Sequence, residues 1–232
     1  MSSIQRNVET YAGFARADPT DSLAVITWMG GALPQDLVRD APLASYSQDL
    51  GPRLAEFSKD VRQELASTDP PAHLTIAGHS YGGAVVGIAE TAGLDADRVL
   101  HIESAGMGNG VQAVDQYHPV NPQVQRFSMT APGDSIEWFR GGQTSSVGHG
   151  ANPDSMDGVI RLATGNYADG TRVDGVASHS GVFAVGSDSW QNMYEVFTGG
   201  VIAVYTPPVY DASTPWGVLN GQDQPPTSKD IP

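Results

Sequence analysis

Short apolar runs separated by polar, glycine-rich stretches follow one another along most of the chain. Short runs that resemble strands lie at 23–28, where β-forming residues are frequent, and at 73–77, 98–102 and 124–129, and a weaker one lies at 159–162. Their residues are apolar on both faces rather than alternating, which is typical of strands buried inside a parallel sheet. The pattern therefore predicts buried strands at these positions.

Helical periodicity lies between these runs. Apolar residues recur at helical spacing from 50 to 65 with charges between them, and the Asp-Pro-Pro of 69–71 stops this amphipathic helix. A second helix is expected at 83–93, where small residues allow close approach to the sheet. A last helix is expected at 187–198, with a Ser/Asp cap before it and a glycine after it. This alternation predicts an α/β fold with a mostly parallel sheet and helices on both faces.

Length and composition place the chain among globular proteins. We expect one α/β domain over residues 1–205, and an extended, partly disordered tail rich in Pro, Gly, Ser and Asp over 206–232. The formal net charge of −14 argues against binding to nucleic acid or to an anionic membrane. No run is apolar enough for stable membrane insertion, and the N-terminus lacks the apolar core of a signal peptide. We expect a cytoplasmic protein, or a secreted one if the natural N-terminus is longer.

The sequence AGHSYGGAVVG at 77–87 carries the clearest candidate chemistry. It matches G-x-S-x-G and lies between a predicted strand and a predicted helix, which is the context of a nucleophile elbow. We expect flanking glycines because a Cβ there would collide with the strand or the helix. Ser80 would be the nucleophile, and the backbone N–H of Tyr81 would donate to an oxyanion.

A serine nucleophile needs a base, and two histidines are candidates. The other four lie in predicted strands, in the elbow or in a proline-rich loop, where we expect structural or exposed roles. His149 and His179 remain. We favour His179, because it follows the last predicted strand and precedes the last helix, where the base of this fold belongs.

The acid has one preferred candidate and one rival. Asp134 follows the strand at 124–129, so its carboxylate could accept from His179 Nδ1 and fix the tautomer. Glu103, at the end of the preceding strand, is the rival acid, or it packs or caps. Asp154 and Asp157 lie in a loop, where we expect them to be solvated.

The substrate wall is predicted from apolar residues near the triad segments. Met107, Trp138, Phe139 and Phe183 are candidates for this wall, with ordinary core packing as the alternative. No insertion resembling a large lid is visible, so we expect short or medium acyl chains. Cysteine is absent, and neither a metal cluster nor a phosphate-binding glycine loop is visible, so we expect no metal and no cofactor.

Four segments in order resemble an actinobacterial α/β-hydrolase family known as domain of unknown function 1023. The resemblance covers residues 23–199, and the segments are GHSYGGAVVGIAE, RVLHIESAGMG, APGDSI and SHSGVF. It implies the α/β-hydrolase fold, with Ser80 as nucleophile, Asp134 as acid and His179 as base. In that superfamily a second oxyanion donor comes from a loop after an earlier strand. We expect the N-terminal strands to be missing and the activity to be weak.

The sequence therefore predicts a serine hydrolase that cleaves a small ester by acyl transfer. Two alternatives remain open at this point: a thioesterase or peptidase that uses the same triad, and a non-catalytic binding domain of the same fold.

Overall fold

Four parallel strands form the central sheet of the protein, in the order β1-β2-β3-β4. The structure, a computed structural model, describes residues 3–20, 22–36, 39–68, 70, 72–136, 147–207 and 225–231. The strands are β1 (Thr75–His79), β2 (Arg98–Ile102), β3 (Gln125–Met129) and β4 (Val159–Arg161). Each matches a predicted run, so the predicted parallel sheet is confirmed.

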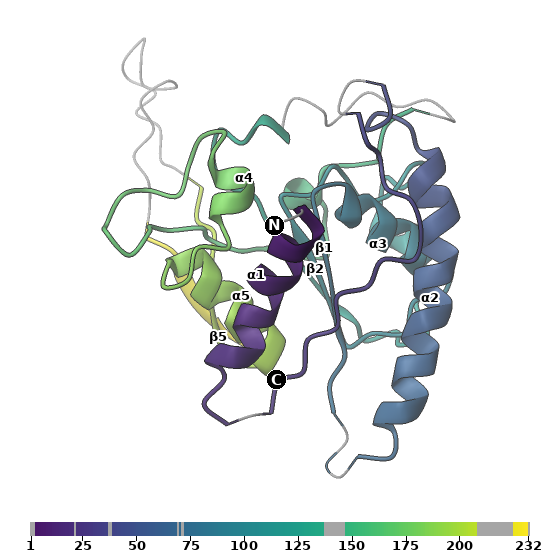
Figure 1. Cartoon of the computed structure of the whole chain (residues 1–232), viewed down its shortest axis with the longest axis horizontal. Coiled ribbons are helices and arrows are strands. Elements are labelled where there is room, and N and C mark those ends of the chain that lie inside the picture. Colours follow the sequence, from purple (N-terminus) through teal and green to yellow (C-terminus); the bar gives the residue numbers. More distant parts are fainter. Residues whose placement is uncertain are drawn as a thin grey trace.

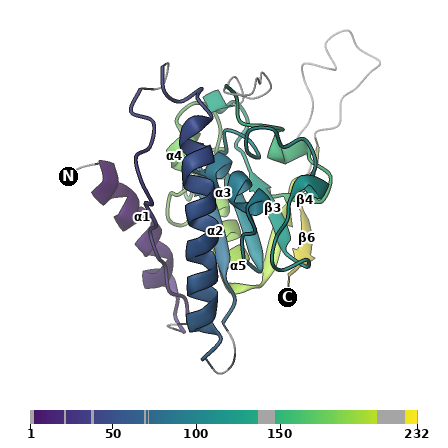
Figure 2. The ribbon, with the colours of Figure 1, turned by 90° about the vertical axis from the view of Figure 1, so that its right-hand side faces the viewer.

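Helices cover both faces of this sheet (Figure 1). The helices are α1 (Ser3–Ala17), α2 (Ser45–Leu65), α3 (Tyr81–Thr91), α4 (Ser178–Gly181) and α5 (Asp188–Thr198), with 3₁₀ turns η1 (Val114–Gln116) and η3 (Pro153–Ser155). Figure 1 shows α2 and α3 on one side of β1 and β2 and α5 on the other, and Figure 2 views the molecule from the α2 side. The predicted helices at 50–65, 83–93 and 187–198 correspond to α2, α3 and α5. In the described ranges, none of the helices is long and apolar enough to cross a bilayer.

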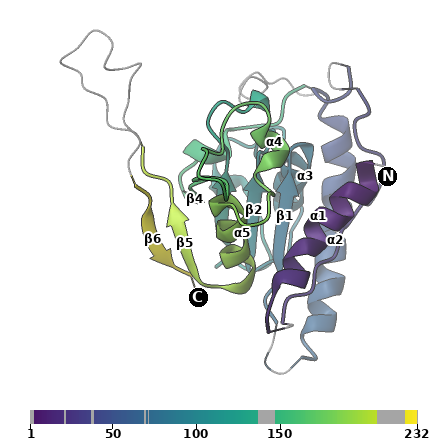
Figure 3. The same ribbon diagram turned by 60° about the vertical axis from the view of Figure 1, so that its left-hand side comes forward.

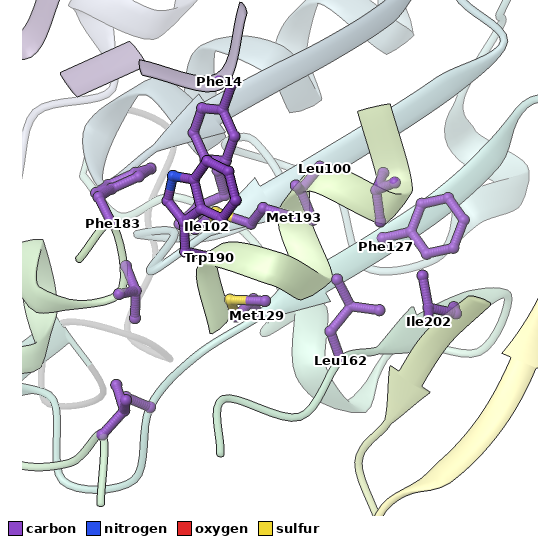
Figure 4. Close-up of a cluster of buried hydrophobic side chains, with 14 of the residues drawn as sticks. Phe14, Leu100, Ile102, Phe127, Met129, Leu162, Phe183, Trp190, Met193 and Ile202 are labelled. Carbon is purple, nitrogen blue, oxygen red and sulfur yellow. The ribbon is translucent and has the colours of Figure 1, made fainter. Parts of the chain in front are cut away.

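The alternating faces of β2 show how the two apolar layers form. Every residue of this strand is buried. Leu100 and Ile102 face a cluster built with α1 and α5 (Figure 4), whereas Val99 joins the cluster built with α2 and α3. A fully buried side chain of this size contributes about 1.5–3 kcal/mol. Burial on both faces therefore stabilises the central strands. The candidate site lies at the carboxyl ends of these strands.

Helix α1 was not predicted from the sequence. It packs on α5 through Phe14, whose ring stacks on Trp190 with centroids 4.9 Å apart. Just after the helix, the Asp18 carboxylate accepts N–H groups of the following turn and lies 3.2 Å from the Tyr194 hydroxyl. Tyr11 and Phe14, three residues apart and both turned toward the core, are the periodic signal for this helix.

The strand predicted at 23–28 is wrong. Residues 22–36 are described without regular secondary structure, and Val25 and Ile26 are 36% and 63% exposed. Only Leu23 and Trp28 pack against the two apolar clusters. A strand exists through backbone pairing, and in the described sheet β1 pairs with β2 alone. Apolar, β-branched composition does not supply the missing partner.

The C-terminal part combines a well-capped helix with a small second sheet. Ser187 Oγ accepts the Trp190 N–H at 3.1 Å at the start of α5, and Gly199 ends the helix with a φ of 78°. Strands β5 (Val201–Val204) and β6 (Thr227–Asp230) then pair antiparallel beside α5 (Figure 3). Residues 208–224, between these strands, lie outside the described residues.

Candidate active site

Ser80 occupies a strained turn between β1 and α3. Its φ of 55° and ψ of −123° lie outside the regions that side chains prefer. Two backbone hydrogen bonds fix the turn to the end of β2: the Ser80 N–H donates to the Ile102 carbonyl at 2.9 Å, and the Ala105 N–H donates to the Ser80 carbonyl at 3.1 Å. The serine is therefore held at the carboxyl edge of the sheet, where parallel α/β folds place their ligands.

The glycines of the elbow do not all have the same function. A Cβ at Gly78 would collide with the backbone of Gly82, and a Cβ at Gly83 would collide with Ser104. At Gly82, in contrast, a Cβ would meet no heavy atom of the described residues within 4 Å. The expected steric need for glycine on both sides of Ser80 is therefore correct for Gly78 and wrong for Gly82. The second close approach is one residue later, at Gly83.

Tyr81 links the elbow to the start of α2. Its hydroxyl donates to the Leu43 carbonyl at 2.6 Å and accepts the Ser47 N–H at 3.1 Å. It thereby takes the place of a side-chain cap at a helix whose N-cap residue, Ala44, has none. The backbone N–H of Tyr81 belongs to the first turn of α3, where amide groups lack partners within the helix and can bind a negative charge.

Asp134 and His179 form a direct pair at the same edge. Asp134 follows β3 and is 1% exposed, and its Oδ2 lies 2.8 Å from His179 Nδ1 in α4. Its Oδ1 accepts the Ile136 N–H at 2.9 Å. Burial raises the pKa of Asp134, but hydrogen bonds from His179, Glu103 and Ile136 outweigh burial and lower it to about 2. The carboxylate is therefore ionised at neutral pH and faces the imidazole.

Glu103 lies beside this pair. It follows β2, is fully buried, and accepts the Ala131 N–H through Oε1 at 2.9 Å. One polar atom from each of Glu103, Asp134 and His179 lies within 4.8 Å of the others. The structure thus brings both acids weighed from the sequence to His179, with Asp134 in contact with its ring.

His79 is a site residue that the sequence analysis set aside as structural. Its Nε2 lies 2.7 Å from the backbone carbonyl of His179, and the two rings are 4.9 Å apart. Burial, together with the nearby His179, lowers the pKa of His79 to about 4, so the neutral ring donates this hydrogen bond. The residue before Ser80 therefore ties the elbow to the histidine segment. No local signal could reveal a contact between positions 100 residues apart.

Three further residues predicted for the site, His149, Met107 and Phe183, each have their own environment. His149 is 5% exposed, its Nε2 donates to the Ala41 carbonyl at 2.7 Å, and burial lowers its pKa. Met107 is fully buried in a cluster with Val111, Tyr117 and Met156. Phe183 packs edge-on against His79 at 5.0 Å.

Two candidates for the substrate wall, Trp138 and Phe139, lie outside the described residues.

Glu103, Asp134 and His179 could together offer three ligand atoms to a metal ion. The distance of 2.8 Å between Asp134 and His179 is that of a hydrogen bond, with the Nδ1 proton between the two atoms. A metal ion would have to displace that proton. The arrangement fits a proton-transfer pair better than a metal centre.

A strained serine turn and a carboxylate–histidine pair at the carboxyl edge of a parallel sheet agree with a match to a family model. The family model described as alpha/beta hydrolase matches residues 2–140, more than half of the chain. The chain belongs to the alpha/beta hydrolase family. Comparisons with curated proteins and with solved structures found no match.

Membership in the alpha/beta hydrolases supports hydrolase activity in general. The matched part of this alpha/beta hydrolase includes Ser80, Glu103 and Asp134, whereas His179 lies beyond it. The narrower resemblance to the actinobacterial family stays a prediction. In the structure, His179 nevertheless contacts the matched part through its hydrogen bonds with Asp134 and His79.

Proposed function

We propose that the protein is a serine hydrolase that cleaves carboxylic esters through Ser80, His179 and Asp134. The observation that carries this proposal is the 2.8 Å contact between His179 and Asp134 at the strand edge that also holds the Ser80 turn. His79 supports it, because its hydrogen bond joins the residue before the nucleophile to the backbone of the base.

In the acylation step, His179 Nε2 takes the Ser80 hydroxyl proton while Oγ attacks the ester carbonyl carbon. Asp134 holds the proton on Nδ1, which leaves Nε2 free of a proton and able to accept one. The Tyr81 N–H donates to the oxyanion of the tetrahedral intermediate. As this intermediate collapses, the imidazolium returns its proton to the leaving alcohol.

In the deacylation step, water replaces the alcohol. His179 removes a proton from that water, hydroxide attacks the acyl-enzyme, and the proton then returns to Ser80 Oγ. Asp134 stays ionised throughout and stabilises the imidazolium by charge. Its low pKa, about 2, supports this assignment because the group does not compete for the transferred proton.

We propose short or medium acyl chains as substrates. Phe183 packs on His79 and could form one apolar side of the acyl site. Trp138 and Phe139, outside the described residues, stay candidates for that wall, and Met107 lies in a separate buried cluster. Thioesters and amides react by the same steps, so the triad alone does not identify the scissile bond. Rates measured on a panel of esters, thioesters and amides separate these classes.

A fluorophosphonate probe tests the nucleophile. An activated serine reacts covalently with the probe, so the wild type should be labelled and Ser80→Ala should not. Ser80→Ala should also lose about 10⁴- to 10⁶-fold in kcat on p-nitrophenyl esters. Ser155→Ala, at an exposed serine, is the matched control and should keep both labelling and turnover.

Two outcomes would overturn the assignment. Unchanged turnover in Ser80→Ala would exclude Ser80 as the nucleophile. A wild type that binds esters but is neither labelled nor active would favour the non-catalytic binding domain.

A further inference from the structure

Glu103 has a backbone conformation that requires an explanation. Among the described residues, Ser80 and Glu103 are the two that are not glycine and have a positive φ, 55° and 43°. Such a conformation costs of order 1 kcal/mol or more and persists where the surrounding structure enforces it. Both residues lie at the same edge of the sheet, directly after β1 and β2. The surrounding structure therefore holds the Glu103 backbone in a strained conformation, as it holds that of Ser80.

Hydrogen bonds fix both ends of this residue. The Glu103 N–H donates to the Met129 carbonyl at 2.8 Å, and the side-chain Oε1 accepts the Ala131 N–H at 2.9 Å. A carboxylate oxygen of Glu103 lies within 4.8 Å of one of Asp134, and hydrogen bonding from Glu103 helps to lower the pKa of Asp134. Neither carboxyl group is more than 1% exposed. Two buried carboxyl groups thus lie close together at the carboxyl edge of the sheet.

A hydrogen bond between two carboxyl groups needs one proton, and two adjacent buried carboxylates would repel each other. Asp134 accepts from the His179 ring and from the Ile136 N–H, and both contacts favour its ionised form. The shared proton therefore belongs on Glu103. Asp134 and His179 are the titratable groups that cluster with Glu103, and Tyr167 also interacts electrostatically with it.

We propose that Glu103 is a positioning residue that carries a proton at neutral pH and donates it in a hydrogen bond to Asp134. Asp134 then stays ionised and oriented toward His179, and the site holds a single negative charge. That charge matches the single positive charge that His179 gains when it takes the serine proton. This inference rests on the proposed function, because it concerns the acid of the same triad.

Glu103→Gln is the decisive variant. Its amide N–H can still donate to Asp134 and its carbonyl can still accept the Ala131 N–H, but it cannot ionise. We expect its kcat/KM to stay within about threefold of wild type, whereas Glu103→Ala loses the donor and should fall about tenfold. The Gln variant decides the matter even if the Ala variant does not fold.

The titration of the His179 ring gives a readout without turnover. It can be followed by NMR in a Ser80→Ala background, with Glu103→Gln added. If Glu103 is neutral, its replacement by Gln should move the midpoint by less than about 0.3 of a pH unit. If Glu103 were ionised, removing its negative charge would lower the midpoint by about one unit, and that result would overturn the inference.

Infrared spectroscopy can detect the proton directly. Wild type at pH 7 should show the carbonyl stretch of a buried protonated carboxylic acid, and Glu103→Gln should lose it. Glu90→Gln removes another fully buried carboxyl group, one paired with Arg126, and should leave that band unchanged. A wild type without the band would overturn the inference.

The two proposals fail in different ways. A wild type that the fluorophosphonate does not label would overturn the proposed function. A labelled wild type whose His179 midpoint falls in Glu103→Gln would overturn the inference about Glu103 alone.

Discussion

Two buried carboxylates in this protein have partners of different kinds. Glu90, in α3, is fully buried and lies 2.6 Å from Arg126 Nε of β3, whose side chain is 11% exposed. Asp134, equally buried, lies 2.8 Å from His179 Nδ1, whose side chain is 28% exposed. The first pair lies between α3 and the sheet, and the second lies at the end of the strands.

The difference lies in what each partner can do with a proton. A guanidinium stays charged at every pH that the fold survives, so Arg126 neutralises Glu90 permanently and can only hold α3 on β3. An imidazole gains and loses its charge near neutrality, so Asp134 is fully neutralised only when His179 takes a proton. Burial alone does not separate Glu90 from Asp134, whereas the chemistry of their partners does, and this difference supports the proposed catalytic role of Asp134.

The largest effect is expected from a variant that disrupts the proposed catalytic pair of Asp134 and His179. Asp134→Asn should lower kcat by about 10⁴-fold, because an amide can hold the imidazole in the wrong tautomer and cannot stabilise the imidazolium. Unfolding in urea should show that the variant is folded. Asp157→Asn, at an exposed position in a loop, is the control and should keep full activity. Comparable kcat values for both variants would remove Asp134 from the triad.

The next largest effect is expected from a variant that disrupts the ion pair of Glu90 and Arg126. Arg126→Met leaves Glu90 charged and buried, and should reduce the free energy of unfolding by about 3 kcal/mol. The kcat of the folded fraction should not change. Adding Glu90→Gln to this variant should restore much of the stability, because the unpaired charge is then gone. A large loss of kcat in folded Arg126→Met would contradict the separation of the two regions.

Acid should weaken the catalytic pair within a defined range of pH. The pKa of Asp134 falls from an ordinary 3.8 to about 2 on folding, so its stabilising contribution is present above about pH 4 and is lost as pH falls through about 2. The contribution at neutral pH is about 2 kcal/mol. The measurement is the difference in unfolding free energy between wild type and Asp134→Asn from pH 5 to pH 2. A difference that grows on acidification would have the wrong sign.

The smallest expected effect concerns the hydrogen bond that positions the base. His79→Phe keeps an aromatic ring beside Phe183 but removes the donor to the His179 carbonyl. A net hydrogen bond is worth about 1 kcal/mol, so kcat should fall about five- to tenfold with KM little changed. His118→Phe, at an exposed histidine, is the control. Equal kcat values in the two variants would show that this tie is not needed for turnover.

Local sequence patterns determined much of the framework. The strands β1 to β4, the helices α2, α3 and α5, and the serine turn each follow from signals within a few residues, whereas β5 and β6 were not predicted. For example, Ser187 and Gly199 delimit α5 through hydrogen bonding and backbone conformation at those positions. The order of strands and turns also predicted Asp134 and His179 as site residues, because the ends of parallel strands lie at one edge of the sheet.

Tertiary structure alone decided which residues gain partners from distant segments of the chain. The apolar run at 23–28 has the composition of a strand but gains no partner in the described sheet. The tie from His79 to His179, the meeting of Glu103 with Asp134, and the collision that requires glycine at Gly83 all join segments that are distant in sequence. A residue's own neighbours set its backbone preference and periodicity, whereas its partners depend on where the sheet brings other segments. The chemistry of this site depends on those partners.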